Sequence, residues 1–225
     1  MSKIFSIAID GPSAAGKSTL AKALARELNA MYLDTGAMYR AFGLYMLRRG
    51  AASDPAAIAA CVDDVNITVD YVDGAQRICL DGEDVSQAIR EPEVSMAAST
   101  VSAVPKVRER MVALQRKIAE GHSVVMDGRD IGTKVLPNAT LKVFLVASAE
   151  VRARRRCREL AEKGMEQPYE QVLEEMIRRD YQDTHRAASP LMPAEDAVHL
   201  DSSDMTLDQT VAAMHALALE AIRRQ

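Results

Sequence analysis

Residues 11–18 read Gly-Pro-Ser-Ala-Ala-Gly-Lys-Ser and fit the pattern G-x-x-x-x-G-K-[ST]. The apolar, β-branched segment from Ile4 to Ile9 precedes the motif and indicates a buried strand. Leucines then recur at helical spacing, at positions 20, 24 and 28. Glycines in such a strand-to-helix turn let consecutive N–H groups converge on an anion, and the helix N-terminus adds partial positive charge. The chain therefore has to place a phosphate-binding loop between a buried strand and a helix.

Each residue type in this loop has a chemical reason. The Lys17 ammonium can bridge the β- and γ-phosphates of a nucleoside triphosphate, and the Ser18 hydroxyl can ligate Mg²⁺. We expect Lys17 to face solvent. The predicted donor-nucleotide set is Gly11, Ser13, Ala14, Ala15, Gly16, Lys17, Ser18 and Thr19.

The loop motif together with the remaining hydrophobic pattern predicts an α/β protein with a P-loop NTPase fold. Further strands are expected at 30–33, 123–126, 141–147 and 197–200. Helices are expected at 37–49, 93–103, 106–120, 170–187 and from Thr206, where Thr206 and Gln209 form a capping-box pair. Ser148 can cap an arginine-rich helix after the strand at 141–147. Strands that alternate with helices favour a five-stranded parallel sheet flanked by helices.

One segment departs from this pattern. From Val65 to Tyr71 apolar and polar residues alternate, and the alternation continues through Ile78 and Leu80. Asp-Gly pairs at 73–74 and 81–82 separate the alternating stretches, as in β-hairpin turns. We expect a small antiparallel β insertion at residues 63–90 within a single P-loop domain, 1–225.

Composition excludes several classes. The 225 residues carry a net charge of −4, which disfavours a general nucleic-acid binder. No stretch approaches the ~20 apolar residues of a membrane helix, and residues 1–10 lack the features of a secretory signal. We therefore expect a cytoplasmic protein without nucleic-acid or membrane partners. The three cysteines and four histidines show neither a disulfide framework nor metal-ligand spacing.

The P-loop alone does not decide between kinases, GTPases and ATPases. GTPases read guanine with Asn-Lys-x-Asp, and none of the three asparagines precedes a lysine. A motor or transporter ATPase usually brings larger coupling domains. A kinase acting on a small acceptor remains.

Charged side chains follow two other predicted strands. Residues 34–40 read Asp-Thr-Gly-Ala-Met-Tyr-Arg, and residues 127–130 read Asp-Gly-Arg-Asp. Both follow the carboxyl end of a strand, where ligands bind in open α/β sheets. Arg179, Asp183 and Arg186 are spaced to share a helix face, although an exposed ion-pair ladder explains them equally well.

With these motifs the chain resembles the bacterial cytidylate kinases over essentially its whole length. The matching segments are Asp10–Lys17, Leu33–Arg40, Ala97–Ser99, Pro105–Arg108, Asp127–Gly132 and Asp183–Ala187. The insertion is similar to the enlarged NMP-binding insert of that family. The resemblance implies ATP-dependent phosphorylation of CMP or dCMP, with Mg²⁺ as cofactor.

The resemblance also implies roles for individual residues. Lys17, Arg129, Arg186, Arg155 and Arg156 would act on the transferring and acceptor phosphates. Arg40 would join Arg129 and Arg186 at the acceptor phosphate. The ribose would face Thr35, Tyr39, Arg179 and Asp183, and cytosine would be read by Ser99, Arg108 and Asp130. A helical lid at 152–170 would close over the donor phosphates, and Ser202 and Ser203 would lie near the adenine.

The chain departs from the family at Ala14-Ala15, where Gly-Ala is common; we expect Ala14 to adopt an ordinary φ. A small-metabolite kinase of the shikimate or gluconate type and a non-catalytic ATP-binding regulator are the alternatives. We expect a monomer.

Overall fold

A computed structural model of the protein describes residues 3–72, 74–162 and 164–225. The chain divides into two compact units, one formed by residues 1–32 and 122–225 and the other by Leu33–Gly121. The expected turn at residues 73–74 falls partly outside the described residues, because Asp73 is not among them.

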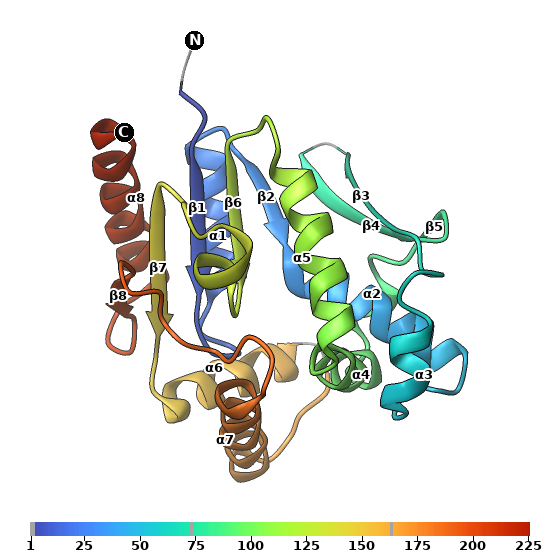
Figure 1. Ribbon diagram of the computed structural model, residues 1–225. Helices are drawn as coiled ribbons and strands as arrows, with labels where there is room; N and C mark the ends of the chain where they lie inside the picture. The colour runs from blue at the N-terminus through green and yellow to red at the C-terminus, as the bar shows by residue number, and fades with distance from the viewer. Residues whose placement is uncertain (1–2, 73, 163) are drawn as a thin grey trace. The chain divides into compact units, whose positions relative to one another are not determined.

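The five-stranded sheet has the order β2-β6-β1-β7-β8 and contains the strands that the sequence predicts (Figure 1). The strands are β1 Ser6–Asp10, β2 Met31–Asp34, β6 Val124–Gly128, β7 Leu141–Val146 and β8 Val198–Asp201. β1 pairs in parallel with β6 and β7, and Asp10 lies opposite Gly128 in the β1–β6 register. The loop after Asp10 and the pair Arg129-Asp130 after Gly128 therefore leave the sheet at the same edge. The predicted parallel fold is confirmed.

Helices in the first unit cover the sheet and extend beyond its edge. They are α1 Lys17–Glu27, the π-helical turn η2 Ile131–Val135, α6 Ala149–Glu162, α7 Tyr169–His185 and α8 Leu207–Arg224. α1 packs against β6 and α8 (Figure 1). Ile7 and Ile9 form a buried core with Leu20, Leu24 and Met214. Burial of these alternate strand residues under two helices fixes the position of the loop between β1 and α1.

The second unit contains the predicted antiparallel sheet, of order β3-β4-β5, together with helices. Its elements are α2 Thr35–Arg48, α3 Pro55–Ala60, β3 Ile67–Val72, β4 Ala75–Leu80, β5 Glu83–Asp84, η1 Ala88–Arg90, α4 Pro92–Ser102 and α5 Pro105–Ala119. α3 is not predicted from the sequence, because it spans only six residues; Asp54 caps it by accepting the N–H groups of Ala56 and Ala57.

Local capping signals place two helix starts correctly. The Ser148 hydroxyl accepts the N–H of Val151 at the start of α6, and Thr206 and Gln209 form both bonds of the capping box at α8. Among the described residues, no helix is both long enough and apolar enough to cross a membrane.

Candidate active site

Two glycines shape the loop between β1 and α1. Gly11 has a φ of 149°, and a Cβ atom on it would lie 2.0 Å from the carbonyl oxygen of Leu145 on β7. Gly16 has a φ of 89° and is the N-cap residue of α1. The first glycine is required because another strand passes close to the loop, and the second because the backbone turns through the left-handed region.

Ala14 lies between these glycines with a φ of 56°. The expectation of an ordinary φ at this position is therefore wrong. The left-handed conformation costs an L-residue roughly 1–2 kcal/mol relative to the right-handed one. The half-buried Ala14 side chain packs against an apolar cluster of α6 and α7. The surroundings, rather than local preference, hold this residue in its conformation.

Lys17 is buried, with 5% of its surface exposed, so the expectation that it faces solvent is also wrong. Its Nζ donates a hydrogen bond to the carbonyl oxygen of Pro12 at 2.6 Å. Burial and the charge of Arg129 hold the pKa of Lys17 well below its usual value, while Asp127 and Asp10 oppose the shift. The loop thus keeps the Lys17 amino group away from bulk water, where a bound anion would strongly stabilise its charged form.

Asp127, near the carboxyl end of β6, links the loop to the sheet. The Ser18 hydroxyl donates to Asp127 Oδ2 at 2.8 Å, and the Tyr32 hydroxyl donates to Asp127 Oδ1, also at 2.8 Å. Asp127 is 5% exposed. Thr19, which follows Ser18 in α1, is exposed. The arrangement places a carboxylate and a hydroxyl oxygen together at the start of α1.

Asp10 fixes the chain that follows Arg129 and Asp130. Its Oδ1 and Oδ2 accept the backbone N–H groups of Ile131 and Gly132 at 2.8 and 2.7 Å. Burial raises the pKa of Asp10 to about 6, although both N–H groups oppose that shift. Asp130 is itself buried and immediately precedes the π-helical turn η2. This turn is absent from the sequence prediction, because it depends on Asp10, which is more than a hundred residues away along the chain.

Asp183 gathers arginines around one carboxylate. Arg129 Nε donates to Asp183 Oδ2 at 2.8 Å, and Arg186 Nη1 lies 3.7 Å from Asp183 Oδ1. Burial alone would raise the pKa of Asp183, but Arg129, Arg186 and Arg179 hold it below its usual value. The sequence predicts one helix face for these residues, whereas α7 ends at His185 and Arg186 has extended backbone angles. Arg186 nevertheless turns back to Asp183, and its Nε donates to the carbonyl oxygen of Ser189 at 2.7 Å.

The two predicted lid arginines differ in their surroundings. Arg155 donates through Nη2 to the carbonyl oxygen of Ser202 at 2.7 Å and through Nη1 to its hydroxyl at 3.4 Å. Arg156 pairs with Glu159 one turn further along α6, at 2.9 Å between Nη1 and Oε2. Arg155 is therefore tied to the segment after β8, whereas Arg156 lies in a surface ion pair.

In the second unit, Asp34 organises the start of α2. Its Oδ1 accepts the N–H of Ala37 at 2.9 Å, and its Oδ2 lies 3.9 Å from Arg40 Nη1 and 3.5 Å from Arg90 Nη1. Thr35, the first residue of the helix, is buried. The capping aspartate thus brings two guanidinium groups to the helix N-terminus.

Tyr39 and Arg108 also meet within this unit. The Arg108 guanidinium carbon lies 5.2 Å from the centroid of the Tyr39 ring, and its Nη1 donates to the carbonyl oxygen of Ser102 at 3.2 Å. Ser99 lies half-buried on α4. α4 packs closely on α2, since a Cβ on Gly43 would lie 2.8 Å from the backbone nitrogen of Ala98. Close helix packing therefore holds Ser99 beside the helix that carries Tyr39.

Sequence reasoning missed several residues of this constellation. It placed Asp10, Asp34 and Asp127 in its motif segments without giving any of them an individual role, and it did not single out Tyr32. Asp10 and Asp34 are the last residues of β1 and β2, and Asp127 is the penultimate residue of β6. An aspartate as the last or penultimate residue of an apolar strand was the available signal, because it stands at the edge where loops bind ligands. Tyr32 carried no such signal.

Comparison with known proteins gives one family. The family model described as cytidylate kinase matches residues 7–220. A cytidylate kinase from Caldicellulosiruptor bescii is 47% identical over 224 residues, which are 99% of each chain. A cytidylate kinase from Enterococcus faecalis is 51% identical over 217 residues, 95% of each chain. Among solved structures, a shikimate kinase from Bacteroides thetaiotaomicron aligns with a TM-score of 0.49 and 16% identity, covering 96% of this chain and 99% of that one.

Proposed function

This chain belongs to the cytidylate kinase family, and from that premise we propose that it transfers the γ-phosphoryl group of ATP to CMP or dCMP, giving ADP and CDP or dCDP. The match to the family over nearly the whole chain carries the proposal. The loop from Gly11 to Ser18, at the edge of the sheet where Arg129 and Asp130 also emerge, supports it physically.

On the donor side, we propose that the N–H groups of the loop and the N-terminus of α1 bind the ATP phosphates. Lys17 would neutralise charge on the β- and γ-phosphates. Because burial disfavours its positive charge, phosphate binding would raise the pKa of Lys17 back towards its usual value. The attraction between ammonium and phosphate would be strong there, since little water screens it.

Mg²⁺ fits the residues present. The Ser18 hydroxyl and the Asp127 carboxylate offer hard oxygen donors, and Mg²⁺ prefers one or two protein oxygens together with phosphates and water. Bound Mg²⁺ would neutralise charge that develops on the transferring phosphoryl group. Tyr32 would hold the Asp127 carboxylate in place by donating to its other oxygen.

On the acceptor side, we propose that Arg129 and Arg186 hold the CMP phosphate, with Arg40 as a third contact. Asp183 supports both Arg129 and Arg186. Two arginines would offset the repulsion between donor and acceptor phosphates. The acceptor oxygen is already anionic near neutral pH, so that positioning and charge stabilisation suffice without a protein nucleophile.

For the nucleoside, we propose three readers of cytosine: Ser99, Arg108 and Asp130. Thr35, Tyr39, Arg179 and Asp183 would face the ribose. The packing of α2 on α4 and of Arg108 on Tyr39 supports a preformed surface in the second unit.

Segment 63–90 would act as the NMP-binding insert. Segment 152–170 would act as a lid that excludes water, through Arg155 and Arg156. The cytoplasmic location and the monomeric state stay predictions.

The experiment is a panel of nucleoside monophosphates assayed by coupled ADP release. We expect ADP to appear with CMP and dCMP and to be near the background without an acceptor. ADP release that needs no nucleotide acceptor would indicate an ATPase. ATP binding without any turnover would indicate a regulator, and turnover with shikimate or gluconate alone would indicate a small-metabolite kinase.

A further inference from the structure

Arg152 is a buried arginine at the start of the predicted lid to which the proposed function gives no task. It is 4% exposed, whereas the other arginines of α6 are half-buried or exposed. Its Nε donates to the carbonyl oxygen of Ala147 at 2.8 Å. Its two Nη atoms donate to the carboxylate oxygens of Asp180 on α7 at 3.1 and 2.5 Å. A guanidinium held at this many points cannot swing with a moving lid.

One further contact joins Arg152 to the phosphate-binding loop. Its Nη1 also donates to the carbonyl oxygen of Ser13 at 3.1 Å. In a trans peptide, the carbonyl oxygen and the following N–H point in opposite directions. When Arg152 holds the oxygen of Ser13, it therefore also fixes the direction of the Ala14 N–H, which must point away from the guanidinium.

Ala14 provides an independent connection between the same elements. Its side chain packs against a cluster of buried residues on α6 and α7: Ala153, Leu160, Val172 and Met176. Its φ of 56° is unfavourable for alanine, so the conformation needs support from outside the loop. The polar contact at Ser13 and the apolar contact at Ala14 supply that support from the same pair of helices.

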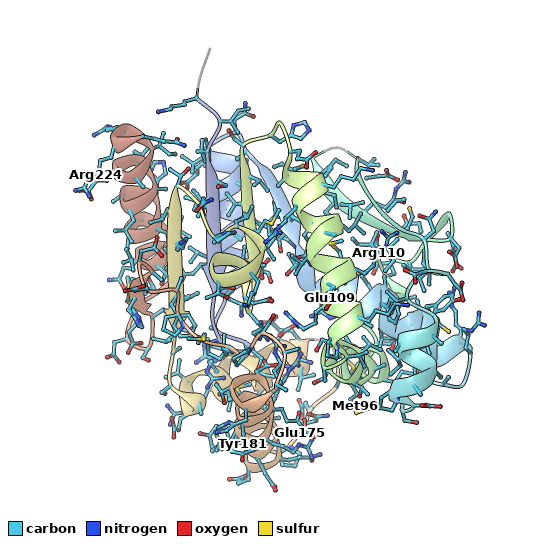
Figure 2. All side chains as sticks on the ribbon, viewed as in Figure 1. Met96, Glu109, Arg110, Glu175, Tyr181 and Arg224 are labelled. Atoms are coloured by element: carbon cyan, nitrogen blue, oxygen red, sulfur yellow. The ribbon has the colours of Figure 1, made fainter. Side chains whose placement is uncertain are left out.

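α7 carries a second carboxylate one turn beyond Asp180. Asp183 lies three residues later and holds Arg129 and Arg186. Figure 2 labels two exposed residues of α7, Glu175 and Tyr181. Asp180 therefore holds the phosphate-binding loop through Arg152. Asp183, on the same helix, holds the two arginines proposed for the acceptor phosphate.

We propose that Arg152 is a positioning residue for the donor nucleotide: it orients the Ser13–Ala14 peptide so that the Ala14 N–H is available to an ATP phosphate oxygen, and Asp180 fixes the guanidinium. The inference rests on the proposed use of ATP. It makes Arg152 part of the rigid base of the lid.

The test compares Arg152→Lys with Asp180→Asn. Lysine keeps the charge but cannot reach Ser13, Ala147 and both oxygens of Asp180 together, because it presents one nitrogen instead of three. We expect the dissociation constant of ATP, measured without an acceptor, to rise roughly 10- to 100-fold in Arg152→Lys. The rise should be smaller in Asp180→Asn, since the amide oxygen still accepts one bond. The KM for CMP should change less than threefold in both.

A matched control is available at the surface. Arg48 and Glu83 form a two-point ion pair of similar geometry, at 2.6 and 2.8 Å, but both side chains are exposed. Arg48→Lys should leave the ATP dissociation constant and turnover unchanged. A double-mutant cycle of Arg152→Lys and Asp180→Asn should be non-additive for ATP binding.

Two results would overturn the inference. One is an unchanged ATP dissociation constant in a variant with lowered thermal stability, which would make the contacts purely structural. The other is a rise in the KM for CMP equal to that for ATP. If Arg152→Lys does not fold, Asp180→Asn alone decides between the same outcomes. Failure of the proposed kinase activity is separable, because the wild-type chain would then bind ATP but release no ADP with any monophosphate.

Discussion

The Ser18 hydroxyl donates a hydrogen bond of 2.8 Å to Asp127 Oδ2, and this bond connects the first turn of α1 to the end of β6. Both groups are oxygen ligands of the type that Mg²⁺ prefers. The second oxygen of Asp127 is held by Tyr32. The pair thus offers the oxygen atoms that the proposed Mg²⁺ site needs, and Tyr32 supports the carboxylate.

Asp127→Asn should raise the Mg²⁺ concentration needed for half-maximal turnover by roughly tenfold or more, because the amide replaces an anionic ligand with a neutral one. Titration of Mg²⁺ at saturating ATP and CMP measures this. Tyr32→Phe is the control: it removes only the supporting hydroxyl and should cause a smaller rise. An unchanged Mg²⁺ requirement in Asp127→Asn would contradict the proposed metal site.

Lys17→Ala should lower kcat by about 100-fold or more, because a group that stabilises developing phosphate charge is lost. The variant should still fold, as circular dichroism would show, since burial already disfavours the ammonium in the folded chain. Lys17→Met serves as the control, because it keeps the apolar stem without the charge and should show the same kinetic loss. A kcat within tenfold of the wild type would refute the role of Lys17.

Gly11→Ala should disrupt the loop more than Gly16→Ala does. The added Cβ at position 11 would meet the carbonyl oxygen of Leu145 at 2.0 Å, so β1 and β7 would have to separate. At position 16 the Cβ meets nothing within 4 Å, and only the φ of 89° is unfavourable. We expect a loss of about 1–2 kcal/mol for Gly16→Ala and a larger loss for Gly11→Ala in urea unfolding. Equal losses would mean that the backbone angle alone matters.

Ionisation of the buried Asp10 carboxyl group should lower the free energy of unfolding as pH rises. Its pKa is raised from 3.8 to about 6 in the folded chain, so between these values the folded state binds more protons than the unfolded state. This contribution to stability is fully present below about pH 4 and is lost as pH rises through about 6.

Urea unfolding at pH 5 and 7.5 tests this in the wild type and in Asp10→Asn, whose side chain does not titrate. The wild type should lose on the order of 1 kcal/mol more than the variant over this interval. Other carboxylates titrate in both proteins and cancel in the comparison. Parallel pH profiles would show that Asp10 has an ordinary pKa.

The parallel sheet and the position of the loop could be predicted because local patterns determine them. The strand before Gly11 and the leucines after it fix the order of strand, loop and helix. The parallel register then brings Arg129 to the same edge as the loop. Such inferences need only strand direction and turn chemistry.

The errors concern residues whose state depends on distant parts of the chain. Ala14 takes a left-handed conformation beside the apolar cluster of α6 and α7, and Lys17 is buried near charged groups of distant segments, such as Asp127 and Arg129. The partner of Arg152 is on another helix, 28 residues further along the chain. No local pattern reports such contacts, because they arise only when the sheet and its helices have packed.

Asp130 should decide between the two pyrimidine bases. The exocyclic amine of cytosine is a hydrogen-bond donor, and an ionised carboxylate is an acceptor-only group that suits it. Uracil has a carbonyl oxygen at that place, which would oppose the carboxylate.

Loss of one charge-assisted hydrogen bond corresponds to roughly 10- to 150-fold in kcat/KM. We therefore expect Asp130→Asn, whose amide can donate, to lower kcat/KM for CMP by that factor and to leave UMP unchanged or improved. Ser99→Ala is the matched comparison, because its hydroxyl would donate to acceptors that both bases offer and should affect both equally. A parallel fall for CMP and UMP in Asp130→Asn would instead mean that Asp130 acts through the neighbouring Arg129, and side-by-side kinetics with the two substrates separate these outcomes.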